Sequence, residues 1–386
     1  MKPITMTFIL WAILAAQALA LEIEDNLSYR YPLTTDGTLH NVILMIGDGM
    51  GLSQIASARL HAKSVDGFLE FDRLPVSGLV KTYSANHVIT DSAAAGTALA
   101  TGYKTNNGVI SLTPDGKPLY TILEAAHDHG MATGLVVTST LTDATPAVFA
   151  AHNIDRRNEV QIAVDMLRNN VDVLLGGGKA FFIPAKNNGS KRNDELDLVK
   201  RAQRQGYTFI ETRDNLLATN AKKLLGLFHL DALTTVYPEP SLAEMTDKAI
   251  QILKQRAKGF FLMVEGSQID WGSHGNNAEK TIRQTLLFDQ AIAVAMKFAA
   301  MDQRTLVIVT ADHETGGMAI THDKINNKAT IEWSTEYHTG VDVPIFAYGP
   351  YAIDFTGVMD NTKIPRKIGS HLGLEDFPDI KKQKEK

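Results

Sequence analysis

The chain has 386 residues and no cysteine. Disulfides, thiolate ligands for zinc and a cysteine nucleophile are therefore excluded. A chain of this length can bury enough surface to fold without covalent cross-links. If the protein binds zinc, its ligands must come from histidine, aspartate and glutamate.

Long apolar runs are also missing beyond the N-terminus, where a membrane span would need about 18 uninterrupted apolar residues. Residues 1–20 read "MKPITMTFILWAILAAQALA", with Lys2 as the only charge and small residues at the end. This pattern is typical of a secretory signal peptide, and the small-residue ending argues against a buried N-terminal helix. We expect an exported, periplasmic or secreted protein that begins near Leu21. Without a cysteine to lipidate, we expect no membrane anchor.

Positive and negative charges nearly balance along the chain, so there is no large excess of either sign. Its formal net charge is −5 and becomes −6 when Lys2 leaves with the signal peptide. A mildly acidic protein binds polyanions poorly, so nucleic acid is not expected as a specific partner. Any anion site must be a local cluster.

Continuous apolar runs alternate with helical patterns along the chain. Such runs are typical of strands buried on both faces, and they occupy 41–46, 134–138, 171–177, 260–266, 305–312 and 343–349. Long helical stretches cover 119–129, 241–257 and 277–300. The alternation predicts an α/β fold, with a mainly parallel sheet flanked by helices on both faces.

The domain organisation predicted is one large domain over 21–386, because no Pro/Gly/Ser-rich linker divides the chain. Residues 184–240 are more polar and less regular, which favours a peripheral insertion or lid. The tail "KKQKEK" is expected to fray.

Acids and imidazoles follow four of the expected strands. Ligands of open α/β sheets bind beyond the carboxyl ends of the strands. Each motif alone has an ordinary structural reading as a turn or helix cap. Together, unpaired carboxylates at one edge would repel one another, so cations are expected there. The residues concerned are Asp48, Asp143, Thr145, Glu265, Asp270, His274, Asp312 and His313.

The ligand types indicate which cations these are, since imidazole suits zinc and carboxylate or hydroxyl oxygen suits magnesium. Asp270 and His274 are four residues apart, so one helical turn would place both on one face. Asp312 and His313 are adjacent and could share an ion. His338 is expected in a loop before the strand at 343–349 and, taken alone, would read as a structural histidine.

Ser92 lies in "VITDSAAAGTALATG", residues 88–102. One reading makes it a helix N-cap before an alanine-rich helix. Another makes it a nucleophile at a helix N-terminus that favours an anion. Its surroundings lack the G-x-S-x-G pattern, so metal coordination would have to activate the hydroxyl. Two metal ions suit phosphoryl transfer, and Arg156 or Arg157 could fork onto the phosphate.

The motifs together resemble those of the alkaline phosphatase family. The blocks "NVILMIGDGMG", "VITDSAAAGT", "DATPAVFAAH", "VEGSQIDWGSH" and "VTADHETGG" follow the family's order between about Asn41 and His338, and "VPIFAYGP" extends the match. The resemblance implies a phosphomonoesterase that releases inorganic phosphate through a phosphoserine intermediate on Ser92. "EGSQIDWG" is closer to forms from marine and cold-adapted bacteria.

The resemblance also implies two zinc ions, one magnesium ion and a homodimer. Asp48 would bridge the second zinc and magnesium, and Asp143 would bind magnesium directly or through water. Arg156 matches the family's phosphate-clamping arginine better than Arg157 does, and Asp91 and Trp271 would also lie on the substrate side. The implied ligands are Asp270, His274 and His338 for the first zinc, Asp48, Asp312 and His313 for the second, and Asp48, Thr145, Glu265 and Asp143 for magnesium.

Two departures from relatives stand out. The enterobacterial form carries lysine at the position of Trp271 and mammalian forms carry histidine, and tryptophan cannot supply that charge to phosphate. The enterobacterial form also has disulfides, which this chain cannot form. The short interval from His313 to His338 predicts a small crown insertion.

Three alternatives remain. A related two-metal phosphodiesterase or pyrophosphatase would usually carry threonine as nucleophile and lack the oxygen-rich third site. Sulfatase chemistry is disfavoured because its modified cysteine has no counterpart. An exported metal- or phosphate-binding protein without turnover would not need Ser92.

Overall fold

The structure is a computed structural model that describes residues 31–34, 37–62, 67–323 and 328–379. The expected signal peptide and the tail at 381–386 lie outside these residues. Within them, no helix is both long and apolar enough to cross a membrane.

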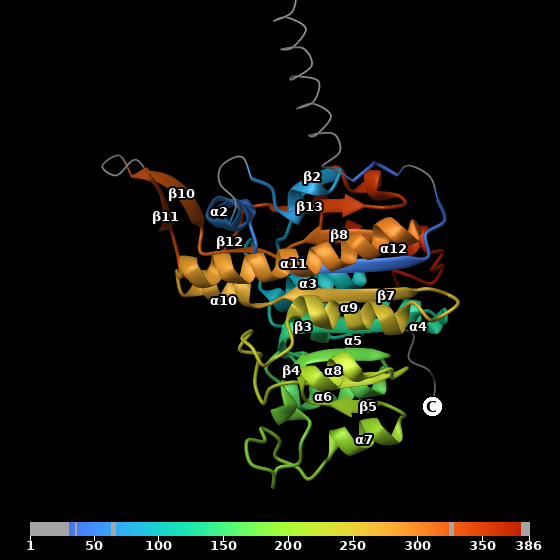
Figure 1. Cartoon of the computed structure of the whole chain (residues 1–386). Coiled ribbons are helices and arrows are strands. Elements are labelled where there is room, and N and C mark those ends of the chain that lie inside the picture. The colour runs from blue at the N-terminus through green and yellow to red at the C-terminus, as the bar shows by residue number, and fades with distance from the viewer. Residues whose placement is uncertain (1–30, 35–36, 63–66, 324–327, 380–386) are drawn as a thin grey trace, which may run out of the picture.

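A ten-stranded sheet forms the centre of the molecule (Figure 1), in the order β14-β2-β13-β8-β1-β7-β3-β4-β6-β5. β13 runs antiparallel to both of its neighbours, and the other pairs are parallel. The strands are β1 (Asn41–Gly47), β2 (Val76–Lys81), β3 (Ala132–Thr140), β4 (Val173–Gly177), β5 (Thr208–Ile210), β6 (Leu224–Leu227), β7 (Phe260–Gly266), β8 (Thr305–Thr310), β13 (Val343–Tyr348) and β14 (Gly357–Asp360). All six predicted strands are present, and the mainly parallel sheet is confirmed.

Helices cover both faces of this sheet. The longest, α11, packs against α2 and α9 on one face, while α3, α4, α5, α6 and α12 form a connected layer on the other. The helices are α2 (Leu52–Ala62), α3 (Ser92–Thr101), α4 (Ile122–Asp128), α5 (Ala144–Ala150), α6 (Glu159–Arg168), α7 (Leu198–Arg204), α8 (Arg213–Ala218), α9 (Leu242–Leu253), α10 (Gln268–His274), α11 (Ala278–Asp302) and α12 (Lys363–His371). Three short 3-10 turns are η1 (Glu70–Arg73), η2 (Lys179–Phe181) and η3 (Ala352–Phe355).

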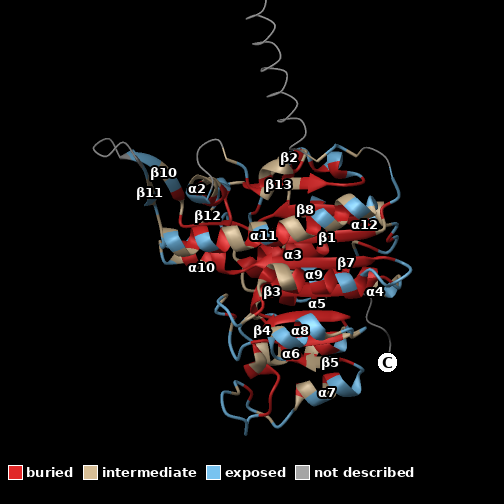
Figure 2. Ribbon diagram, in the orientation of Figure 1, coloured by how far each residue is buried: buried red, intermediate tan, exposed pale blue. Residues whose placement is uncertain are grey.

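The central strands are buried along their whole length because helices cover both of their faces (Figure 2). This explains why their sequences are continuously apolar rather than alternating. A rigid sheet of this kind holds the residues that follow its strands in fixed relative positions.

Residues 184–240 contain α7, β5, α8 and β6, and the strands β6 and β5 extend the sheet beyond β4 at one edge. The interval between His313 and His338 contains β9 (Glu314–Thr315) and the hairpin β10 (Met318–Asp323) and β11 (Lys328–Trp333). The hairpin projects from the body of the molecule in Figure 1.

His338 begins β12 (His338–Thr339), so the expected loop at this position is wrong. His338 pairs with Thr315 and Thr339 with Glu314 in an antiparallel bridge between β12 and β9. This pairing fixes His338 next to the segment that follows β8.

Candidate functional site

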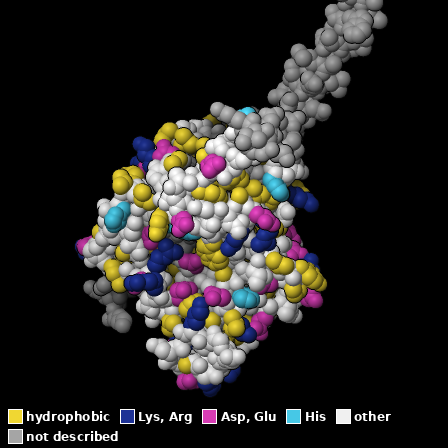
Figure 3. Space-filling model, turned by 90° about the vertical axis from the view of Figure 1, so that its left-hand side faces the viewer, with side chains coloured by type: hydrophobic (Ala, Val, Ile, Leu, Met, Phe, Trp, Pro, Cys, Tyr) yellow, Lys and Arg dark blue, Asp and Glu magenta, His cyan; other side chains and the backbone are white. Residues whose placement is uncertain are grey.

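The predicted site residues gather at one edge of the sheet, where β8, β1, β7 and β3 end. These strands are neighbours in the sheet, and Ile46 on β1 is level with Glu265 on β7 and Thr310 on β8. Figure 3 faces the side of the molecule on which α10 and the β10–β11 hairpin lie. Acidic, basic and histidine side chains are interspersed there with hydrophobic ones, with no large field of one sign.

Asp270, His274 and His338 form the first candidate ligand group, called the first group below. His274 donates from Nδ1 to the carbonyl of Glu336 at 2.5 Å, and His338 donates from Nδ1 to the carbonyl of Thr90 at 2.8 Å. Since a carbonyl only accepts, each neutral ring keeps a lone pair on Nε2. The two Nε2 atoms lie 3.1 Å apart, and the Asp270 carboxylate lies 3.4 Å from one and 3.7 Å from the other. A divalent cation satisfies such a set of converging acceptors.

A second group surrounds His313, which is fully buried and stacks on His338 with ring centroids 3.6 Å apart. Its Nε2 lies 3.2 Å from Asp312 Oδ2 and 3.6 Å from Asp48 Oδ1. These two carboxylate oxygens are buried and have no hydrogen-bond partner among the described residues. Asp270 lies within reach of this group as well, together with Asp48 and His313. Asp270 thus faces both groups.

The carboxylates of this site are buried and lie close to one another, so a bound cation would offset the cost of ionising them. Burial raises the pKa of Asp48 well above its ordinary value, and the neighbouring Asp312, Asp270 and Glu265 add to this. Burial likewise raises the pKa of Asp312. For His313, burial and the nearby His338 lower the pKa well below its ordinary value, which keeps the ring neutral.

Ser92 is the first residue of α3 and is buried, with Oγ 3.2 Å from His313 Nε2. The N-cap of α3 is Asp91, whose Oδ1 accepts from the backbone N–H of Ala94 at 2.9 Å. The reading of Ser92 as the cap is therefore wrong. Because Asp91 satisfies that N–H, Ser92 is free to face the ligand group.

Arg156 lies between two carboxylates. Its Nη1 is 3.2 Å from Asp91 Oδ2, and its Nη2 is 3.1 Å from Asp143 Oδ1. Burial lowers the pKa of Arg156, but Asp143, Asp91 and Asp48 outweigh this and raise it above its ordinary value. Arg157 instead points to solvent and pairs with Asp155. Of the two candidates, Arg156 is the one that the fold positions at Ser92's helix.

The oxygen-rich residues lie next to the second group. Glu265 is 1 % exposed, and burial together with Asp143 raises its pKa to about 8. Thr145, in the first turn of α5, acts in the opposite direction and lowers the pKa of the Glu265 carboxyl. Asp143 is the N-cap of α5 and accepts from the N–H of Ala144.

Trp271 lies on α10 between two first-group ligands and is half-buried. Lys280 Nζ is 5.7 Å from the centre of its ring, a cation–π distance.

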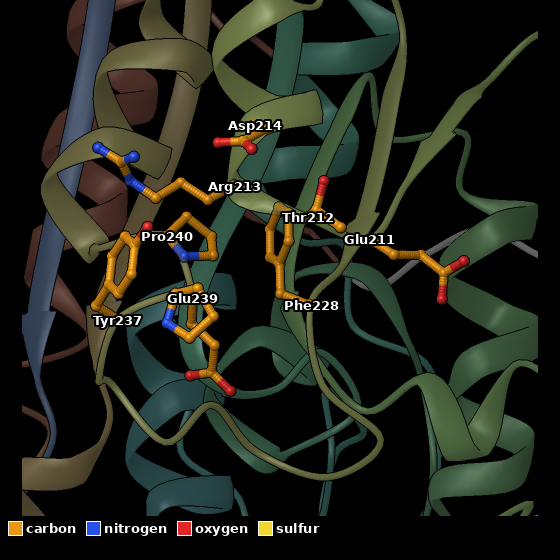
Figure 4. Close-up of a pocket in the computed structure, with 9 residues that line it drawn as sticks. Glu211, Thr212, Arg213, Asp214, Phe228, Tyr237, Glu239 and Pro240 are labelled. Carbon is orange, nitrogen blue, oxygen red and sulfur yellow. The ribbon is translucent and has the colours of Figure 1, made fainter.

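A pocket of about 280 Å³ elsewhere on the surface contains none of the predicted site residues (Figure 4). It lies between α8, β6 and the segment before α9, and Phe228, Tyr237 and Pro240 line it.

Two residues that the sequence reasoning missed support the cluster. Thr315 donates from Oγ1 to Asp270 Oδ1 at 2.5 Å. Gly49 has φ +70° and approaches so closely that a Cβ would lie 2.8 Å from Asp270 Cα. The "GDGMG" and "DHETGG" motifs contain both residues, but the sequence alone does not say which members touch the ligands.

This geometry defines the class of the protein: an α/β protein with a buried hydroxyl, imidazoles and carboxylates suited to divalent cations at the carboxyl ends of its strands. The family model described as alkaline phosphatase matches residues 39–326 and 318–374. The chain belongs to the alkaline phosphatase family and is a phosphatase.

Individual relatives agree with this assignment. Alkaline phosphatase 4 of Bacillus subtilis is 36% identical over 409 residues, covering 84% of this chain and 87% of the relative. The alkaline phosphatase of Escherichia coli K12 is 34% identical over 414 residues, covering 88% of each. Each of these relatives matches more than four fifths of this chain.

Solved structures include cold-active bacterial alkaline phosphatases, as the sequence motifs indicated. The enzyme of the Antarctic bacterium TAB5 is 37% identical with a TM-score of 0.81, covering 88% of this chain and 99% of that one. The cold-active enzyme of a Shewanella species is 33% identical with a TM-score of 0.79, covering 86% and 99%. A TAB5 variant was solved with Mg bound in its M3 site.

Proposed function

We propose that this phosphatase hydrolyses phosphate monoesters to an alcohol and inorganic phosphate through a phosphoserine intermediate on Ser92. The observation that carries the proposal is the Ser92 hydroxyl, 3.2 Å from His313 Nε2. Two unpartnered carboxylate oxygens, on Asp48 and Asp312, lie around the same imidazole. A buried hydroxyl among cation ligands is suited to attack phosphorus.

The donors fit two zinc ions and one magnesium ion. Asp270, His274 and His338 supply nitrogen and oxygen donors for one zinc, and Asp48, Asp312 and His313 supply them for the other. Asp48, Glu265, Thr145 and Asp143 offer only oxygens, which suits magnesium. When bound, these cations supply the positive charge that lowers the pKa of a hydroxyl or water and stabilises the departing oxygen.

The chain's own residues would position the phosphate. The guanidinium of Arg156, held in orientation by Asp91 and Asp143, presents its fork to two phosphate oxygens. Ser92 lies at the N-terminal end of α3, where the helix dipole favours a negatively charged group. Small residues after Ser92, namely Ala93, Ala94 and Ala95, leave room for the phosphoryl group.

The reaction then has two displacements. Ser92 Oγ forms a bond to phosphorus, its proton passes to water, and the ester oxygen leaves and takes a proton from water. A water molecule next attacks the same phosphorus and gives up a proton, the bond to Ser92 Oγ breaks, Ser92 Oγ takes a proton back, and inorganic phosphate is released. Arg156 holds the phosphoryl oxygens through both steps.

A comparison of esters tests this proposal. We expect the purified chain to hydrolyse p-nitrophenyl phosphate much faster than bis-p-nitrophenyl phosphate, and to lose activity on chelation and regain it with zinc and magnesium. Mass spectrometry of acid-quenched protein should find phosphate on Ser92. Faster diester hydrolysis would instead support the two-metal phosphodiesterase, and full activity without metal would refute the proposal.

We also propose that the protein is exported, from the sequence of residues 1–20, and that it forms a homodimer, from the family to which it belongs. Expression with a reporter fused after residue 20 tests export, and sedimentation of the mature chain tests the dimer. A reporter retained in the cytoplasm, or a monomer at all protein concentrations, would contradict these two proposals.

A further inference from the structure

Thr315 connects the two ligand groups through its side chain. Its hydroxyl lies 2.5 Å from Asp270 Oδ1 and 3.2 Å from His313 Nδ1, and the residue is fully buried. Asp270 is a ligand of the first group and His313 of the second. The second nitrogen of His313 thus differs from those of His274 and His338, which donate to backbone carbonyls.

The chemistry of the three groups fixes the direction of the hydrogen bonds. An ionised carboxylate only accepts, so the single hydroxyl proton of Thr315 must point to Asp270. The hydroxyl oxygen then has only lone pairs to offer His313, so His313 Nδ1 must carry a proton and donate it. Nε2 then carries no proton, and its lone pair faces Asp48, Asp312 and Ser92.

The backbone holds the hydroxyl in this position. The N–H of Thr315 donates to the carbonyl of Gly49 at 3.2 Å, and the N–H of Gly49 donates to Asp312 Oδ1 at the same distance. A Cβ on Gly49 would lie 2.8 Å from Thr315 Oγ1. Only a glycine lets the turn after β1 approach the hydroxyl this closely.

We infer that Thr315 is a positioning residue that fixes the tautomer of His313 and links the two metal groups through the chain His313 Nδ1–H to Thr315 Oγ1–H to Asp270 Oδ1. The inference relies on the proposed function for the identity of the cations. It implies that removing the hydroxyl weakens cation binding at His313, even though Thr315 is not itself a ligand.

Zinc binding to metal-free protein tests this role without measuring activity. Thr315→Val keeps the shape and removes the hydroxyl, Thr315→Ser keeps the hydroxyl, and Thr321→Val is a matched control on the projecting hairpin. In competition with a chromophoric chelator, we expect Thr315→Val to weaken the binding of one of the two zinc ions by about 10–100-fold. Thr315→Ser and Thr321→Val should remain within about threefold of the unsubstituted chain.

The tautomer of His313 provides a second readout that needs no Thr315 variant. In metal-free protein labelled with ¹⁵N-histidine, long-range proton couplings should show a proton on Nδ1 of His313. Its signals are assigned by their loss in His313→Gln.

Each result distinguishes this inference from the proposed function. Unchanged zinc affinity in Thr315→Val overturns the inference, as does a loss in Thr315→Ser as large as that in Thr315→Val. A proton on Nε2 of metal-free His313 also overturns it, whatever the variants do. An unsubstituted chain that binds no zinc contradicts the proposed function instead, while the tautomer measurement still tests Thr315.

Discussion

Replacing Glu265 by glutamine should change how the stability of the metal-free protein depends on pH. The pKa of Glu265 is about 8 in the folded chain, raised first by burial and then by Asp143, against an ordinary value of 4.5. The folded state therefore holds this proton more tightly than the unfolded chain does. The stability that the proton contributes is fully present below about pH 4.5 and is lost as the pH rises through about 8.

The size of this effect follows from the two pKa values. One group that titrates near 4.5 unfolded and near 8 folded lowers the free energy of unfolding by about 3–4 kcal/mol between pH 5 and pH 8. Unfolding entropy of about 2.1 cal/mol/K per residue makes this about 4 °C in Tm for a chain of 386 residues. Asp48 and Asp312 change in the same direction, so the whole metal-free protein should lose more.

Differential scanning calorimetry of both metal-free proteins measures the difference. Glu265→Gln carries no charge, so its Tm should exceed that of the unsubstituted chain at pH 8 by about 4 °C more than at pH 5. Saturating magnesium should reverse the order at pH 8, because the neutral amide binds the cation less well. A Tm difference that is equal at both pH values would show that Glu265 does not carry a raised pKa in the folded chain.

Three further substitutions test other parts of the site. Ser92→Ala should lower kcat by about a thousandfold or more while zinc affinity stays near normal, and a smaller loss would mean that another group attacks phosphorus. Arg156→Lys should raise KM for p-nitrophenyl phosphate by about 10–100-fold through loss of the fork, whereas the exposed Arg157→Lys should not change it; equal effects would contradict the assignment of the clamp. Gly49→Ala should abolish zinc binding because the new Cβ would lie 2.8 Å from Asp270 Cα. In the control Gly116→Ala, the new Cβ has nothing within 4 Å, so this variant should only lose about 1 kcal/mol of stability through its strained backbone. Retained zinc binding in Gly49→Ala would refute the close approach.

The central strands could be predicted because burial on both faces leaves a continuous apolar run. The runs at 41–46 and 260–266 became β1 and β7 within a residue or two. Four sheet strands escaped prediction. β5 and β14 are short edge strands that are largely exposed, and β2 is only partly buried. β6 is fully buried, but it has only four residues and lies inside the polar, irregular segment 184–240. Burial therefore gives a clear sequence signal only where the apolar run is long enough.

The ligand-bearing motifs could also be found, because acids and imidazoles followed strands that end at one edge. The contacts between individual side-chain atoms could not be predicted from the sequence. Asp91 rather than Ser92 caps α3, and His338 pairs with Thr315 in a short bridge rather than lying in a loop. Both outcomes depend on long-range contacts that local spacing does not encode.

Diffraction from crystals grown with zinc, collected on both sides of the zinc absorption edge, shows directly whether zinc binds beside Ser92. We expect two anomalous peaks, one among Asp270, His274 and His338 and one among Asp48, Asp312 and His313, with Ser92 Oγ beside the second. An absence of zinc peaks at these residues in active protein, or a Ser92 hydroxyl turned away from them, would contradict this expectation.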